Sequence, residues 1–330
     1  MQIDSPNWQT LLATRARQRR QPEATRTVIT LADLPLPAVV ARGELLLVAP
    51  TISDAQLLAV AQAMRQLATA ARVVDAGRWQ QHDLLRVQLT ALPDKDWCRQ
   101  LATELAIDIG VLPTPQPARL VLFDMDSTLI TMEVIDELAK EAGSGKKVAA
   151  ITEAAMRGAL DFNDSLIQRV ATLSGLSLAA VERVKQRLQC NPGVSEFAAF
   201  ARAAGVRLAL VSGGFLPFAL YIGKALQFDN IRANTLGDDG LALTGAVVGE
   251  IVNGEVKART LDELATQYQC DRANVWAVGD GANDRLMLQA AGLGVAFRAK
   301  PALRAVADLA LDVSDMRALA ALQASLTEAP

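Results

Sequence analysis

Apolar residues recur with the helical period in some segments of this chain and with the strand period in others. The change from one period to the other predicts where its helices and strands lie. Near the start, Ser53 with Gln56 matches a capping box, and the apolar residues that follow recur with the helical period. Strands are predicted at residues 44–50, 71–79 and 84–92, and helices after Ser53 and over residues 94–109. We expect this strand, helix, strand, strand, helix order to form a small N-terminal α+β domain.

A second kind of pattern begins after the proline-rich segment at residues 110–120, which is typical of a linker. Apolar runs now stop abruptly at Ser, Gly or Asp and alternate with helical stretches. These runs lie in residues 120–123, 206–214, 275–284, 293–297 and 309–313. Strands alternating with helices predict an α/β fold with a doubly wound, mainly parallel sheet, whose ligands bind beyond the carboxyl ends of the strands.

The stretch between the first two apolar runs is far too long for one crossover helix. Helical spacing recurs at residues 132–142, 148–158, 162–173 and 178–188. We therefore expect an inserted bundle of helices that covers the end of the first strand. Residues 238–257 alternate in polarity and contain an Asn-Gly pair, which predicts a hairpin.

These patterns divide the chain of 330 residues into three parts. The predicted N-terminal domain covers residues 1–112, the helical cap covers residues 132–189, and the α/β core is made of residues 113–131 and 190–330.

Charge and composition exclude several classes of protein. A net charge of -3 argues against a broad nucleic-acid interface, which needs concentrated Lys and Arg. No segment approaches the ~18 uninterrupted apolar residues of a membrane span. Cys98, Cys190 and Cys270 lie far apart and are interpreted as reduced thiols, so we expect a cytoplasmic location. The basic cluster at residues 15–20 is interpreted as a solvated helix face, although contact with an acidic partner is left open.

Two carboxylates, Asp124 and Asp126, directly follow the buried-looking run LVLF. Neighbouring carboxylates repel each other, so this is either an acidic surface turn or a site that holds a cation. An EF-hand is excluded, because Leu129 and Ile135 occupy the positions where that calcium loop needs Gly and Glu.

Polar residues that end two other runs favour the cation. Ser212 and Gly213 end one run, and Asp280, Asn283 and Asp284 end another, and all of them should meet at one sheet edge. Oxygen ligands without His or Cys select a hard ion such as Mg²⁺, which keeps waters and binds phosphate. The single histidine, His82, is distant in sequence and is interpreted as structural.

The segments DMDST, SGG, Lys257 and GDGAND closely resemble, in order and spacing, the four motifs of the haloacid dehalogenase superfamily. The resemblance covers about residues 115 to 320 and implies a Rossmann-like core with an inserted cap. The N-terminal region is similar to the ACT-like extension of some members. The family chemistry is hydrolysis of a phosphomonoester through an aspartyl phosphate. Here the resemblance implies conversion of O-phospho-L-serine to L-serine and phosphate, in serine biosynthesis.

The resemblance also implies a role for each motif residue. Asp124 would be the nucleophile, and Asp126 would protonate the leaving oxygen and then activate water. Mg²⁺ would be bound by Asp124, the main-chain oxygen of Asp126 and Asp280. Ser212, Gly213 and Lys257 would contact the phosphoryl oxygens. Asn283 would contact phosphate or the attacking water, and Asp284 would orient Lys257 or a water molecule behind the metal ligands.

Substrate selection is implied to reside in the cap. Glu133 resembles the residue that pairs with the substrate ammonium, and Arg169 resembles the one that binds its carboxylate. Met156 and Phe162 resemble the apolar lid. A sister phosphatase for phosphothreonine or another small phosphomonoester is the alternative, and a non-catalytic amino-acid sensor is the second class considered.

The sequence departs from the family pattern in two places without removing a reacting group: Arg285 and Leu286 follow GDGAND where Leu-Pro is usual, and Arg298 in AFRAKP stands where His is common. We expect a small-molecule substrate and no nucleic-acid or membrane partner. A homodimer through the N-terminal domain is left open.

Overall fold

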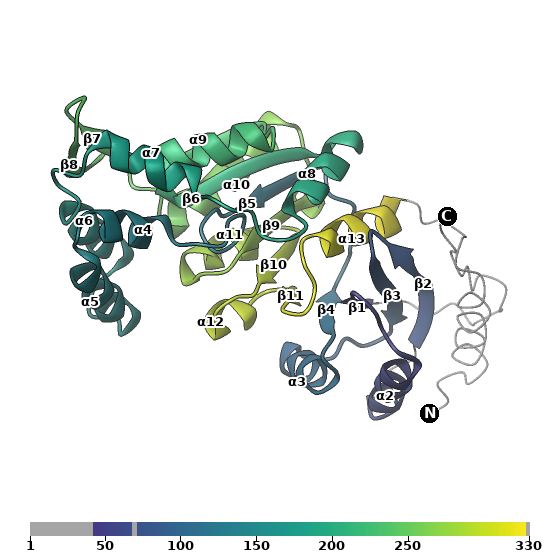
Figure 1. Ribbon diagram of the computed structural model, residues 1–330. Coiled ribbons are helices and arrows are strands. Elements are labelled where there is room, and N and C mark those ends of the chain that lie inside the picture. The colour runs from purple at the N-terminus through teal and green to yellow at the C-terminus, as the bar shows by residue number, and fades with distance from the viewer. Residues whose placement is uncertain (1–41, 68–70, 328–330) are drawn as a thin grey trace.

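The computed structural model describes residues 42–67 and 71–327 (Figure 1). The basic cluster at residues 15–20 therefore lies outside the described residues. Among the described helices, none combines the length and the apolar character that crossing a membrane requires.

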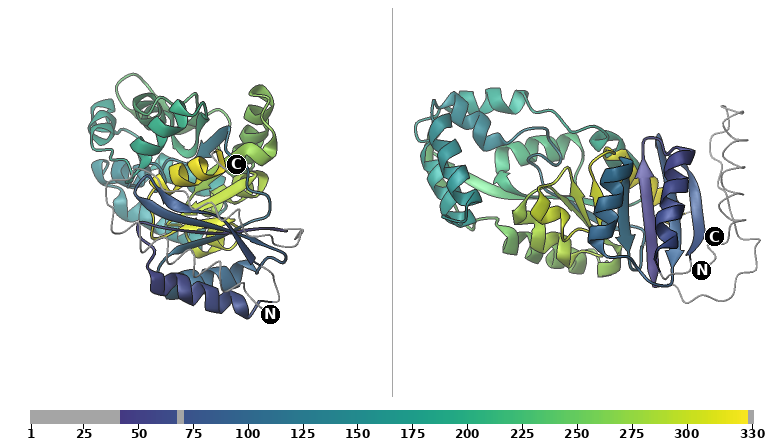
Figure 2. Two further views of the ribbon diagram at one scale, coloured as in Figure 1. Left: turned by 90° about the vertical axis from the view of Figure 1, so that its right-hand side faces the viewer. Right: turned by 90° about the horizontal axis from the view of Figure 1, so that it is seen from below.

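The N-terminal part has the order β-α-β-β-α-β and an antiparallel sheet. Its elements are β1 (Gly43–Ala49), α2 (Asp54–Arg65), β2 (Ala71–Trp79), β3 (His82–Leu89), α3 (Lys95–Leu105) and β4 (Asp108–Leu112). The predicted capping box is confirmed, because the Ser53 side chain accepts from Gln56 N and the Gln56 side chain accepts from Ser53 N. Figure 2 shows α2 and α3 together on one face of this sheet.

The predicted helix over residues 94–109 is wrong at its C-terminal end. It ends at Leu105, and Ala106 takes a left-handed conformation with φ 50°. The chain then forms β4, which pairs with β1 and also contacts β11 through Gly110. Asp108 secures this strand by accepting three backbone N–H groups, from residues 312 to 314, at 2.8 to 2.9 Å. These partners are remote in sequence, so the local pattern could not reveal the strand.

The core contains the predicted α/β sheet. Its strands are β5 (Leu120–Phe123), β6 (Arg207–Phe215), β7 (Asn230–Asp238), β8 (Leu243–Val248), β9 (Val275–Gly279), β10 (Leu293–Phe297) and β11 (Leu309–Leu311). All described strands form one sheet in the order β2-β3-β1-β4-β11-β10-β9-β5-β6-β7-β8. The pairs from β11 across to β7 are parallel, and β8 adds an antiparallel edge. The strand sequence reverses direction between β5 and β9, which is where ligands of such sheets bind.

Helices cover both faces of the core sheet. They are α8 (Val194–Ala203), α9 (Leu216–Ala225), α10 (Gly254–Gln267), α11 (Arg285–Ala290), α12 (Pro301–Arg304) and α13 (Arg317–Thr327), with 3₁₀ turns η1 (Arg272–Asn274) and η2 (Ala282–Asp284). Val121 and Phe123 of β5 pack with α8, α9 and α13, whereas Leu120 and Leu122 pack with α10, α11 and α12. Burial on both faces explains why this strand reads as an uninterrupted apolar run.

Helix α13 joins the two parts of the molecule. It lies on the face of the N-terminal sheet opposite α2 and α3 (Figure 2). There Arg86, paired with Glu44 at 2.7 Å, also donates to the carbonyl oxygen of Ser325 at 3.0 Å.

Four helices follow β5 within a few residues of the predicted positions: α4 (Val134–Glu141), α5 (Gly145–Met156), α6 (Phe162–Ala171) and α7 (Leu178–Gln186). They lie at one end of the molecule (Figure 1). The predicted hairpin exists as β7 and β8, but its turn is at residues 239–242. The Asn-Gly pair instead begins α10, because Asn253 Oδ1 accepts from Val256 N at 3.0 Å and caps that helix. Lys257 therefore lies in the first turn of a helix.

Candidate active site

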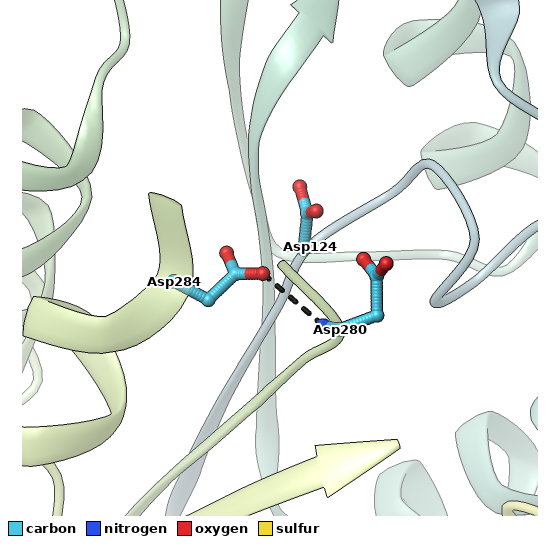
Figure 3. Close-up of side chains that lie close together, drawn as sticks. All are labelled: Asp124, Asp280 and Asp284. Carbon is cyan, nitrogen blue, oxygen red and sulfur yellow. Dashed lines mark hydrogen bonds between the residues drawn. The ribbon is translucent and has the colours of Figure 1, made fainter. Parts of the chain in front are cut away.

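Asp124 and Asp280 follow β5 and β9, the two strands between which the strand order reverses (Figure 3). A backbone hydrogen bond links the ends of these two strands, since Asp124 N donates to Val278 O at 3.0 Å. Both side chains are buried, with exposed fractions of 4% and 9%. The predicted meeting of polar residues at this sheet edge is confirmed for this pair.

Lys257 is fully buried beside them and forms two ion pairs. Its ammonium nitrogen lies 2.7 Å from Asp124 Oδ1 and 2.6 Å from Asp284 Oδ1. Asp284 Oδ2 in turn accepts the backbone N–H groups of Asp280 at 3.1 Å and Gly281 at 3.0 Å. Asp284 therefore ties the lysine to the loop that follows β9, as Figure 3 shows for the bond to Asp280.

The three aspartates could hold a metal ion. Asp124, Asp280 and Asp284 each offer one carboxylate oxygen, and these oxygens all lie within 4.8 Å of one another. Three carboxylates against one lysine leave excess negative charge in a buried place, which favours a cation. An all-oxygen donor set fits a hard divalent ion. Both oxygens of Asp284 already accept hydrogen bonds. Asp124 and Asp280 are therefore better placed to give a carboxylate oxygen to the metal ion.

Burial and like charge raise the pKa values of this cluster. Burial, followed by the charges of Asp124, Asp284 and Glu133, raises the pKa of Asp280 to about 8. Burial and the charge of Asp124 raise the pKa of Asp284 to about 6. Burial opposes the charge of Lys257, but Asp124 and Asp284 outweigh it and raise the lysine pKa above its ordinary value. The lysine is thus a permanent cation within the neutral range.

Asp126 lies against the C-terminal end of β6. Its Oδ1 accepts from Val134 N at 3.0 Å. A Cβ on Gly214 would lie 2.3 Å from Asp126 Oδ2, so only glycine leaves room for this carboxylate. Burial, then the charges of Glu133 and Asp124, raises its pKa well above the ordinary value. A carboxyl group that keeps its proton near neutral pH can act as a general acid.

The SGG segment at the end of β6 lies beside Asp126, with Ser212 fully buried and its Oγ accepting from Gly214 N at 2.9 Å. Gly213 lies under the ring of Phe162 from α6, since a Cβ there would be 2.8 Å from Phe162 Cζ. The structure thus brings Phe162 against the end of β6. Asn283 is half-buried in η2, close to Gly281.

The other predicted cap residues are placed differently. Glu133 accepts from Ser127 Oγ at 2.7 Å. Arg169 is half-buried, and its pKa is lowered by burial although the charges of Glu133, Asp136 and Asp126 oppose this. Met156 ends α5 and is 71% exposed, so a lid role for it stays a prediction.

Residues outside the predicted site also contact it. The fully buried Asn234 donates to Gly213 O and accepts from Val252 N, both at 2.8 Å. Thr128 Oγ1 lies 3.4 Å from Asp280 Oδ1, and Lys300 N donates to Asp280 O at 3.1 Å. Thr128 belongs to the DMDST motif, which was a usable signal. The other two contacts depend on strands and helices that meet only in the folded chain.

The two arginines that depart from the family pattern are exposed. Arg285 begins α11, and the guanidinium of Arg298 stacks on the ring of Phe297 at 5.1 Å from its centroid.

Comparison with known proteins agrees with this geometry. The family model of haloacid dehalogenase-like hydrolases matches residues 121–289. A phosphoserine phosphatase from Idiomarina loihiensis is 48% identical over 197 residues, which is 60% of this chain and 90% of that protein.

Solved structures are similar as well. A probable phosphoserine phosphatase from Vibrio cholerae superposes with a TM-score of 0.73 at 29% identity, over 93% of this chain and 97% of that one. A substrate-bound phosphoserine phosphatase complex has a TM-score of 0.58 at 39% identity, over 62% of this chain and 97% of that chain.

Proposed function

The chain belongs to the haloacid dehalogenase-like hydrolase family, and from this premise we propose that it hydrolyses O-phospho-L-serine to L-serine and phosphate. The observation that carries the proposal is the buried contact of Asp124 with Lys257, 2.7 Å apart, next to Asp280 and Asp126. Named relatives support the substrate class, because proteins 41% to 49% identical are described as phosphoserine phosphatases.

In this proposal Asp124 attacks the phosphorus and takes over the phosphoryl group as an aspartyl phosphate. Asp126 gives its proton to the departing serine oxygen, and its carboxylate then removes a proton from the water that hydrolyses the intermediate. The raised pKa of Asp126 suits the first step, because the carboxyl group must be protonated when substrate binds. The carboxylate left after that step suits the second.

A metal ion belongs to the same proposal. Asp124, the main-chain oxygen of Asp126 and Asp280 would hold Mg²⁺, with Asp284 oriented through Lys257 and the loop amides. When bound, the ion would neutralise negative charge on the nucleophile and the phosphoryl oxygens.

The phosphoryl oxygens need further donors. Ser212, the Gly213 amide and Lys257 are proposed to hold them as charge develops, with Asn283 contacting phosphate or the attacking water. The full burial of Ser212 and Lys257 strengthens such contacts, because little water competes.

Selection of phosphoserine is proposed to come from opposite charges in the cap. Glu133 would pair with the substrate ammonium and Arg169 with its carboxylate, with Phe162 closing the apolar side. Support comes from the surroundings of the half-buried Arg169, whose pKa is lowered by burial while the charges of Glu133, Asp136 and Asp126 act against that lowering. A related phosphatase for phosphothreonine or another small ester is the alternative. The cytoplasmic location, the three-part domain division and the N-terminal homodimer stay predictions.

The test is phosphate release from phosphoserine, phosphothreonine, phosphoethanolamine and p-nitrophenyl phosphate, with Mg²⁺ present. We expect phosphoserine to be preferred, and the preference to disappear in Glu133→Gln/Arg169→Leu. Glu153→Gln/Arg157→Leu removes a matched exposed ion pair from the cap and should change nothing. Equal turnover of all esters by the unaltered protein would disprove the substrate assignment, and unchanged turnover in Asp124→Asn would disprove the nucleophile.

A further inference from the structure

The two segments that join the cap to the core lie side by side. Ile130 on the outgoing segment pairs with Cys190 on the returning segment in an antiparallel bridge. Asn191 N also donates to Leu129 O at 2.9 Å. The returning segment therefore runs beside the turn that follows the paired aspartates.

The side chain of Asn191 is directed into that turn. It is 7% exposed, and its Nδ2 lies 3.2 Å from Ser127 O, 2.9 Å from Thr128 O and 3.1 Å from Ile130 O. Because all three neighbours are carbonyl oxygens, the atom that faces them must be the amide nitrogen, which has hydrogens to donate. Asn191 thus reduces the repulsion between three converging carbonyl groups.

The turn has a backbone that needs such support. Ser127 has a φ of 56°, in the left-handed region that residues other than glycine seldom adopt. The amides of Thr128, Leu129 and Ile130 all point to Met125 O, at 3.2, 2.8 and 3.0 Å. Conformations of this kind persist where the surrounding structure holds them in place.

The same turn carries side chains of the proposed site. Asp126 precedes it, Thr128 Oγ1 reaches Asp280 at 3.4 Å, and Ser127 Oγ donates to Glu133 at 2.7 Å. A shift of the turn would therefore displace the acid, a metal-binding carboxylate and a substrate-binding residue together.

Asn191 is itself anchored to the core. The next residue, Pro192, accepts from Met316 N at 3.2 Å through its carbonyl oxygen. Gly193 has a φ of 82°, and a Cβ there would lie 2.6 Å from Arg317 N, so the backbone is pressed against the start of α13. The asparagine thus holds the turn relative to a fixed part of the molecule.

We propose that Asn191 is a positioning residue for the reaction: its amide group holds the turn at residues 127–130, and so places Asp126 and Thr128 relative to Asp124. The inference rests on the proposed phosphatase function. It extends that function to a residue that lies outside the four motifs, on the segment that returns from the cap.

The test compares Asn191→Ala, Asn191→Leu and Asn191→Ser with Asn274→Ala. Asn274 is a matched control, because its Nδ2 also donates to a backbone carbonyl, that of Pro117 at 2.7 Å, at the other end of β9. With p-nitrophenyl phosphate, which has no ammonium group for Glu133 to bind, kcat should fall by about 10- to 100-fold in the alanine and leucine variants, with KM changed by less than about 3-fold. With phosphoserine kcat should fall to a similar extent. Asn191→Ser keeps one donor and should recover part of kcat. Asn274→Ala should keep kcat within about 2-fold.

Hydrogen exchange of the peptide covering residues 124–134 gives a readout that does not depend on activity. Faster exchange in Asn191→Ala than in Asn191→Ser or Asn274→Ala supports the proposal even if the unaltered protein fails to hydrolyse phosphoserine. That failure would overturn the proposed substrate alone. The positioning role is overturned if kcat of Asn191→Ala matches Asn274→Ala, if only KM changes, or if exchange in this peptide is unaltered.

Discussion

The ammonium nitrogen of Lys257 lies 2.7 Å from Oδ1 of Asp124, and neither side chain is more than 6% exposed. Asp284 holds the same ammonium from the other side at 2.6 Å. One buried cation is therefore shared between the proposed nucleophile and the residue that orients the loop after β9.

Replacing this lysine should damage stability and activity together. Lys257→Met leaves two buried carboxylates without their partner, which costs about 3–5 kcal/mol in the free energy of unfolding. Phosphate release should fall by at least about 100-fold, because a donor to the phosphoryl group is lost. The measurements are denaturant unfolding and turnover, with Lys224→Met on the exposed face of α9 as the control. A stable, active Lys257→Met protein would contradict the assignment.

Metal-free protein should lose stability as pH rises. The pKa of Asp280 is raised to about 8 in the folded state, so folding favours its protonated form. This contribution is complete below the ordinary value of 3.8 and is lost as pH rises through about 8. Thermal unfolding in a chelator between pH 5 and 9 should show a falling Tm. Asp280→Asn should flatten the curve, and an equally steep curve in that variant would assign the effect elsewhere.

Added Mg²⁺ should reverse this trend. The ion competes with protons for the carboxylates, so the Tm gain should increase with pH. At 100 times Kd the stabilisation is about 2.7 kcal/mol. Asp280→Asn should reduce the gain strongly, whereas Asp262→Asn, an exposed aspartate of α10, should keep it. An identical gain in Asp280→Asn would exclude this carboxylate as a ligand.

Asp126→Asn should separate the two halves of the reaction. Loss of the acid and base lowers kcat for phosphoserine by about 10² to 10⁴. With p-nitrophenyl phosphate the leaving group departs without a proton, so a rapid burst of nitrophenolate should precede slow turnover. Stopped-flow absorbance measures the burst, with exposed Asp164→Asn as the control. Equal losses for both substrates without a burst would argue against the role of Asp126.

Asp108→Ala should weaken the junction between β4 and the core. The carboxylate accepts three backbone N–H groups at 2.8 to 2.9 Å, and its loss leaves the buried N–H of Ser314 and the part-buried N–H groups of Asp312 and Val313 without this acceptor. We expect a cost of about 2–4 kcal/mol in the free energy of unfolding, with turnover per folded molecule retained. Denaturant unfolding tests this, with Asp239→Ala in the exposed turn between β7 and β8 as the comparison. Equal stability of the two variants would refute it.

The sequence by itself determined the α/β class, the four cap helices and the meeting of Asp124 with Asp280. The physical reason is local: strands buried on both faces read as apolar runs, and parallel strands of one sheet present their carboxyl ends at one edge. A polar residue directly after such a run is therefore placed by chain pattern alone.

Only the tertiary structure decided the elements and contacts that depend on remote partners. Residues 108–112 became a strand because β1 and β11 lie on either side of them, and the Asn-Gly pair became a helix start because Asn253 caps α10. The anchoring of Asn191 has the same origin, since its carbonyl partners lie more than 60 positions earlier in the chain. Hydrogen bonds between distant segments leave no periodic signal, so they become visible only when the chain is folded.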